Sequence, residues 1–148
     1  MLRVNLICCG KLKERFYIDA CAEYEKRLQR YCSFELTELP ETGDLKKEGE
    51  AILAKIPAGA FVIALCIEGK LKSSEELAAL FKEQSSRGVS RIVLLIGSST
   101  GLDESVKRRA DLRLSMSPMT FPHHLARVMV LEQVYRAFTI NEGSKYHK

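Results

Sequence analysis

Along this chain, segments with the apolar pattern of strands alternate with segments in which apolar residues recur at the three- and four-residue steps of helices. The pattern therefore predicts alternating strands and helices. The most continuous apolar runs, at residues 61–67 and 92–96, predict strands that are buried on both faces. The run at 33–39 alternates and stops before Pro40, which is typical of a half-exposed strand near a sheet edge. The expected strands span residues 2–9, 33–39, 61–67, 92–96 and 112–115.

Helical periodicity fills the intervals between these runs. Apolar side chains recur at three- and four-residue steps from Tyr17 to Tyr31, which predicts an amphipathic helix. Ser73 followed by Glu76 is a capping-box signature that opens another helix, and Gly88 closes it. The expected helices span residues 14–31, 45–56, 73–87, 103–110 and 124–140.

The order of these elements predicts an α/β fold with a mostly parallel sheet sandwiched by helices. A chain of 148 residues without a repeat or linker has the length of one domain, so we expect a single domain over residues 1–148. Ligands of such sheets bind outside the carboxyl ends of the strands. The loops after Ile67, Ile96 and Ser115 are therefore the candidate binding segments.

Charge and cysteine content narrow the class of protein. The 23 Lys and Arg against 19 Asp and Glu give a net charge of +4, which permits a nucleic-acid partner without requiring one. The five cysteines contain no Cys-x-x-Cys pair, so we expect neither a disulfide framework nor a zinc site. No apolar run reaches the ~18 residues that cross a bilayer. We therefore expect no membrane association and a cytoplasmic location.

Two of the candidate loops carry hydroxyl or charged groups beside glycine. Gly97-Ser-Ser-Thr-Gly101 follows a buried strand, but it is neither a dinucleotide fingerprint nor a P-loop. A ligand-binding turn and a tight strand-to-helix connection are equally compatible with it. Glu68-Gly69-Lys70 favours a turn with a solvated ion pair.

The third loop, Met116-Ser-Pro-Met-Thr-Phe-Pro122, has the strongest binding signal. Its prolines restrict the free loop, and its apolar side chains could enclose an adenine ring or a thioether. A satellite core beneath the loop is the alternative, and the composition favours binding.

His123 and His124 open the last expected helix, where the positive end of the helix dipole lowers a histidine pKa and favours the neutral base. A surface or capping role is the alternative for either ring. No third ligand stands at metal spacing, so we expect no metal.

The last helix carries a broad apolar face. Glu132, Arg136 and Thr139 lie on the opposite side, and Arg127 projects into the apolar arc. Such a width predicts a neighbouring helix, from this chain or from a second subunit. The tail after it is expected to fray, although Tyr146 and His147 are also groups that hold a nucleobase.

Several strings in the sequence resemble one known family over essentially the full length. They are Cys9-Gly10-Lys11, Leu94-Leu-Ile-Gly97, Met119-Thr-Phe-Pro-His-His-Leu-Ala-Arg-Val128, Glu132-Gln-Val-Tyr-Arg-Ala-Phe138 and Tyr146-His147. The chain is similar to the RlmH (YbeA-like) family of SPOUT-class methyltransferases. The resemblance implies a trefoil-knotted C-terminal half and a homodimer. It also implies that S-adenosyl-L-methionine (SAM) is used to methylate N3 of pseudouridine 1915 in 23S ribosomal RNA, within the large subunit or the assembled ribosome.

The resemblance also implies site residues. The family's SAM contacts fall on three segments, and Ser98 and Ser99 replace a usual Gly-Pro beside one of them. The implied cofactor-binding residues are Leu65, Gly97, Met116, Ser117, Pro118, Met119, Thr120 and Phe121.

For catalysis, we expect His123 or His147 to act as base or orienting group and Tyr146 to stack on or bond the target base. Arg127 and Arg136 are expected to hold an RNA phosphate or the uracil carbonyls. A SPOUT-type tRNA methyltransferase and a non-catalytic ribosome-interaction module are the alternative functions.

Overall fold

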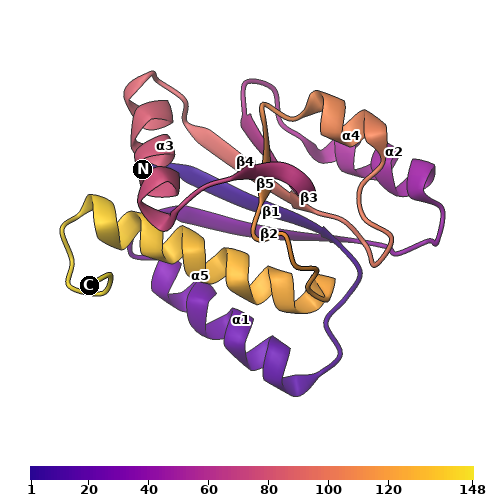
Figure 1. Cartoon of the computed structure of the whole chain (residues 1–148), viewed down its shortest axis with the longest axis horizontal. Helices are drawn as coiled ribbons and strands as arrows, with labels where there is room; N and C mark the ends of the chain where they lie inside the picture. Colours follow the sequence, from indigo (N-terminus) through magenta and orange to yellow (C-terminus); the bar gives the residue numbers. More distant parts are fainter.

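The computed structural model describes residues 1–148 as a five-stranded sheet with helices on both faces (Figure 1). All strand pairs are parallel, and the spatial order is β2-β1-β4-β3-β5. The predicted α/β class and parallel sheet are therefore confirmed. The knot implied by the resemblance stays a prediction. The strands are β1 (Arg3–Cys9), β2 (Ser33–Leu39), β3 (Phe61–Leu71), β4 (Arg91–Ile96) and β5 (Leu112–Ser115).

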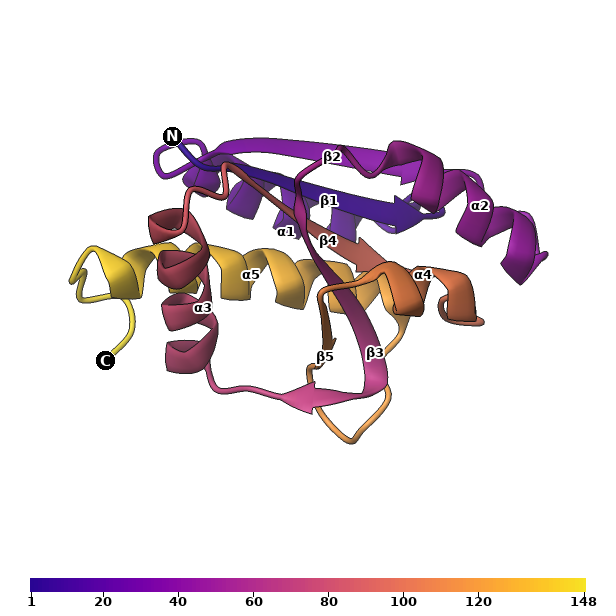
Figure 2. The same cartoon turned by 90° about the horizontal axis from the view of Figure 1, so that it is seen from above.

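The helices form two layers, with α1, α3 and α5 on one face of the sheet and α2 and α4 on the other (Figure 2). None of them combines the length and apolar character that a bilayer span needs. The helices are α1 (Arg15–Leu28), α2 (Leu45–Lys55), α3 (Ser74–Ser86), α4 (Glu104–Arg109) and α5 (His123–Asn141).

Period-two alternation along the central strands builds a separate core on each face. Leu6 of β1 packs with α1, α3 and α5, whereas its neighbour Ile7 packs with α2 and α4. Leu94 and Leu95 of β4 divide in the same way, and all four side chains are fully buried. Burial on both faces explains why these strands are almost wholly apolar, and it fixes the sheet edge where the connecting loops meet.

Local signals placed several element ends correctly. β2 and β5 have their predicted bounds, and β2 lies at an edge of the sheet. Ser73 and Glu76 form the reciprocal capping box at α3, and Gly88 follows that helix with φ +89°. These contacts are local in sequence, which is why the sequence could predict them.

The predicted turn at 68–70 is wrong, because β3 continues through it to Leu71. The strand shifts register between Leu65 and Lys70 where it pairs with β5. A Cβ on Gly69 would lie 2.8 Å from the backbone of Arg113, so only glycine allows this close crossing. The shift leaves residues 66–69 without a pairing partner in β5.

Helix α5 is the central helix of its layer, packed between α1 and α3 of the same chain. The expected neighbour is therefore present without a second subunit. Thr139 was predicted on the polar side, but it is fully buried, and its hydroxyl donates to the carbonyl of Arg136 at 2.7 Å. The amide of Asn141 donates to the carbonyl of Ala78 at 3.0 Å, which fixes the end of α5 against α3.

Candidate active site

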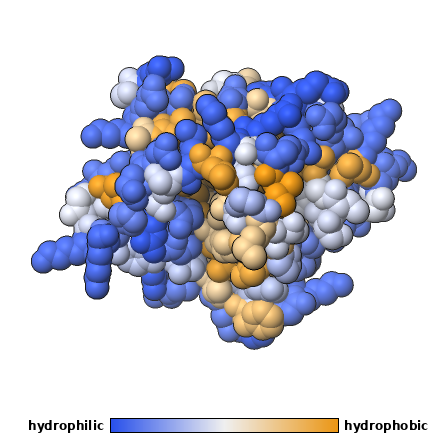
Figure 3. All heavy atoms as spheres, viewed as in Figure 1, coloured by the Kyte–Doolittle hydropathy of each residue, from blue (hydrophilic) through white to orange (hydrophobic).

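The carboxyl ends of β3 and β4 and the segment 116–122 meet in one cavity of about 750 Å³, which we call the notch. Figure 3 shows apolar side chains gathered toward the middle of a mostly hydrophilic face, around the start of α5. All predicted cofactor-binding residues except Pro118 line the notch. The seven that line it are Leu65, Gly97, Met116, Ser117, Met119, Thr120 and Phe121.

Gly97 makes the turn at the end of β4 possible. A Cβ at this position would lie 2.1 Å from the carbonyl oxygen of Gly101. The turn is closed by Gly101 N–H donating to the carbonyl of Ser98 at 2.9 Å. The hydroxyl of Ser98 is buried and donates to Glu48 at 2.9 Å, so this departure from the family's glycine is accommodated on the α2 side.

An ion pair lies beside the notch. The Lys107 ammonium is 2.5 Å from the Glu68 carboxylate, and both residues line the cavity. The hydrogen bond from Lys107 lowers the pKa of Glu68. The ion pair predicted near Glu68 thus exists, but its cation comes from α4 rather than from Lys70.

His123 and His124 begin α5 at the side of the notch, with ring centroids 4.1 Å apart. His123 lines the notch itself, and the Nε2 atoms of both rings are buried without a hydrogen-bond partner. Burial, and then the charge of the neighbouring His124, lower the pKa of His123. The predicted direction is confirmed, although burial rather than the helix dipole is the main cause.

Glu41 is a residue that the sequence reasoning missed. Its Oε2 lies 4.0 Å from Nε2 of His123, and its Oε1 accepts from the backbone N–H and the hydroxyl of Ser99 at 3.4 Å each. It therefore connects the histidine pair with the turn after β4. The signal was available, because Glu41 follows the end of a parallel strand at the same sheet edge.

Arg127 does not face the solvent, contrary to the predicted contact with RNA. Its side chain is 1% exposed, and its donors bind Glu38 at 2.6 Å and the carbonyl of Gly10 at 3.1 Å. A buried guanidinium requires such partners. Arg127 consequently fastens the first turns of α5 to the ends of β1 and β2.

Arg136, Tyr146 and His147 lie together, but far from the notch within one chain. Arg136 is 13 positions after His123, which corresponds to about 20 Å along a helix. The tail folds back instead of fraying. The Tyr146 hydroxyl donates to Glu132 at 2.7 Å, and His147 contacts Arg136 at 3.0 Å and Glu75 at 2.7 Å.

The notch has the dimensions and lining of a site for a nucleoside with an apolar arm. Cavities that bind small molecules typically measure about 300–1,000 Å³ and combine apolar walls with a few polar groups. Nine of its 20 lining residues are hydrophobic, and hydroxyls and backbone groups of the Gly97 turn supply polar contacts. The residues therefore fit an adenosine linked to a thioether or sulfonium chain. No cluster of three or more potential metal-binding side chains forms.

The fold is that of a methyltransferase class. The sequence matches the family described as "Predicted SPOUT methyltransferase" over residues 2–147, and the chain belongs to this family. Among curated relatives, "Ribosomal RNA large subunit methyltransferase H" of Bifidobacterium adolescentis is 48% identical, covering 99% of this chain and 100% of the relative. The protein of the same name from Clostridium novyi is 46% identical with the same coverage. The family expected from the sequence is confirmed.

Solved structures agree on the fold. A probable methyltransferase from Bordetella pertussis Tohama I matches with a TM-score of 0.62 at 14% identity, over 93% of this chain and 96% of that one. The SpoU methyltransferase AviRb from Streptomyces viridochromogenes, solved with AdoMet, matches with a TM-score of 0.50 at 13% identity. That match covers 95% of this chain and 58% of the other.

Proposed function

We propose that this protein transfers the methyl group of SAM to N3 of a pseudouridine in large-subunit ribosomal RNA. The observation that carries the proposal is the meeting of Leu65, Gly97 and Met119, from three separate parts of the chain, around one cavity. The names of the full-length relatives support ribosomal RNA as the substrate. The five free cysteines suit a reducing cytoplasm, where ribosomes are found.

The notch residues would hold SAM, which supplies an electrophilic methyl group when it is bound. Leu65, Met116 and Phe121 offer apolar surface to the base and the thioether chain. The Gly97 turn offers backbone groups without a Cβ in the way. Methyl transfer is an in-line displacement, so alignment of the two reactants is a large part of the catalytic task.

The nucleophile requires a base, because the imide N3–H must lose its proton for attack. A positioned base contributes ~10²–10⁴-fold to the rate. We assign this role to His123 rather than His147. His123 lines the notch and has an unpartnered Nε2. Both ring nitrogens of His147 are engaged, since Nδ1 accepts from Arg136 and the opposite nitrogen then donates to Glu75.

A homodimer would bring the tail to the notch. Tyr146 and His147 are held at the far end of α5 and cannot reach the notch of their own chain in this arrangement. Burial and its hydrogen bond to Glu132 raise the pKa of Tyr146 to about 12, so its phenol is a hydrogen-bond donor at neutral pH. We propose that the folded-back tail, residues 142–148, meets the notch of the partner subunit, and that Tyr146 and Arg136 contact the target nucleotide there.

Labelled methyl transfer tests this function. Purified protein and methyl-labelled SAM are incubated with ribosomes, free large subunits or tRNA, and the modified nucleoside is identified by mass spectrometry. We expect label in 3-methylpseudouridine of large-subunit RNA. Label in tRNA would instead support the alternative methyltransferase, and SAM-independent ribosome binding without transfer would support an interaction module.

A further inference from the structure

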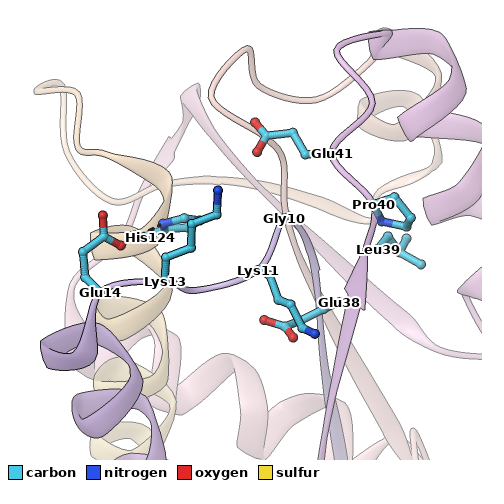
Figure 4. Close-up of a pocket in the computed structure, with 9 residues that line it drawn as sticks. All are labelled: Gly10, Lys11, Lys13, Glu14, Glu38, Leu39, Pro40, Glu41 and His124. Carbon is cyan, nitrogen blue, oxygen red and sulfur yellow. Dashed lines mark ion pairs between the residues drawn. The ribbon is translucent and has the colours of Figure 1, made fainter.

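A second cavity of about 700 Å³ opens at the same sheet edge, between the loop after β1 and the segment that ends β2 (Figure 4). We call it the Lys11 groove and define it by its nine lining residues: Gly10, Lys11, Lys13, Glu14, Glu38, Leu39, Pro40, Glu41 and His124. Only one of its nine lining residues is hydrophobic. The groove is therefore suited to a polar, charged ligand rather than to an apolar one.

The groove adjoins the notch at the histidine pair. His124 lines the groove, His123 lines the notch, and their rings are 4.1 Å apart. Glu41 lines the groove and binds Ser99, which lines the notch. A ligand in the groove would consequently lie directly beside whatever the notch holds.

The histidine pair beside the groove contains polar atoms that lack hydrogen-bond partners. Nε2 of His123 and Nε2 of His124 are buried, and each lies 3.7 Å from the position of a Cβ on Gly10. Leaving a buried polar atom without a hydrogen bond is unfavourable. Gly10, with φ +97°, keeps this space open. These two buried ring nitrogens without partners lie at the border between the groove and the notch.

The rim carries cations that are free of internal partners. Lys11 and Lys13 are exposed, and neither forms an ion pair, whereas Arg15 nearby is paired with Asp19. Among the carboxylates of the groove, Glu38 is neutralised by Arg127 at 2.6 Å. The two remaining carboxylates, Glu14 and Glu41, each lie about 4 Å from a histidine ring nitrogen. The two lysines are thus the cations of the groove that have no ion-pair partner.

We propose that the Lys11 groove binds the nucleotide chain of the RNA substrate, with its phosphates at Lys11 and Lys13 and the target base over the histidine pair. This assignment rests on the proposed function and names the surface that would present the substrate to the notch. Phosphate groups meet the lysines that have no ion-pair partner, and the target base lies beside the histidine pair at the border with the notch. The position beside the notch favours a nucleotide over any other anion.

The test compares two double variants of equal charge. Lys11→Ala/Lys13→Ala removes the rim cations, and Lys46→Ala/Lys47→Ala removes two exposed lysines from α2 on the opposite layer. Binding to ribosomes is measured with S-adenosylhomocysteine present and methyl transfer absent, over a series of salt concentrations. SAM affinity is measured by calorimetry for each variant.

We expect the groove variant to bind ribosomes at least tenfold more weakly, with SAM affinity unchanged. Its slope of log affinity against log salt should fall by about 1.4, because each single-strand phosphate contact contributes about 0.7. The α2 variant should match the wild type. Equal ribosome affinity and salt slope for the two variants would overturn the groove assignment. If the lysines are needed for ribosome binding but the wild-type protein transfers no methyl group, the groove assignment stands and the proposed function is wrong.

Discussion

Arg127 and Glu38 form a buried ion pair of 2.6 Å that joins the first turns of α5 to the end of β2. The same guanidinium binds the carbonyl of Gly10 at 3.1 Å. One side chain therefore holds three chain segments that surround the histidine pair. This relationship makes Arg127 a positioning residue for the site rather than a contact for RNA.

Removal of Arg127 should destabilise the protein strongly. Arg127→Met leaves Glu38 without its partner in a partly buried place, and we expect the free energy of unfolding to fall by about 3 kcal/mol. Denaturant unfolding measures the change. The matched control is Arg87→Met, which removes an exposed pair with Glu83 and should leave stability nearly unchanged. A similar small effect for both variants would contradict the assigned role.

Gly97→Ala should abolish tight SAM binding. The added Cβ would meet the Gly101 carbonyl oxygen at 2.1 Å, so the turn must open and the notch must change shape. We expect calorimetry to show at least a hundredfold loss of affinity. Gly59→Ala is the control, because φ +78° strains that position but nothing lies within 4 Å of the new Cβ. It should lower stability by about 1 kcal/mol and leave SAM affinity intact.

The methylation rate should depend on the protonation of His123. Burial lowers the pKa of His123 below its ordinary value of 6.5, so the base form persists to lower pH than in a free histidine. We expect kcat to be constant above pH 6.5 and to fall only at more acidic pH. His123→Gln should remove this acidic decline of kcat together with most of the activity. An acidic limb unchanged in the variant would show that another group is the base.

The same shift predicts the direction of a stability change. Because the folded-state pKa of His123 is depressed, the unfolded chain binds this proton first as the pH falls below about 6.5. The contribution of the neutral His123 ring to the free energy of unfolding is therefore fully present above pH 6.5. It is lost as the pH falls toward the pKa of His123 in the folded state. The free energy of unfolding, measured from pH 7.5 down to pH 5.5, should fall more for the wild type than for His123→Gln.

Mixing two inactive variants tests the composite site. A chain ending at Ser144 lacks Tyr146 and His147 but keeps its notch, while His123→Gln keeps the tail. In a homodimer that exchanges subunits, half of the dimers would contain one intact site, so about a quarter of wild-type activity should return. Each variant alone should be inactive. A mixture that stays inactive after subunit exchange would contradict a tail acting on its partner.

The sequence predicted what depends on local patterns and on the geometry of parallel sheets. Leu65, Gly97 and Met119 were implied as site residues by the family resemblance. The strand runs, the capping box at Ser73 and the meeting of the loops after Ile96 and Ser115 at one sheet edge follow from periodicity or strand direction. These signals need no knowledge of which elements pack together.

The missed features depend on contacts between distant segments. Gly69 was read as part of a turn because nothing local reveals the crossing over Arg113 that lets β3 continue. The partner of Arg127 lies 89 positions away at Glu38. The tail's order likewise depends on Glu132, which the helix pattern placed opposite the apolar face, and on Glu75 of α3, which lies 72 positions before His147.

A crystal structure with S-adenosylhomocysteine bound shows whether the notch is the cofactor site. We predict one ligand per chain in the notch, in contact with Leu65, Gly97 and the segment 116–121. A ligand seated in the Lys11 groove or elsewhere, with the notch filled only by solvent, would contradict it.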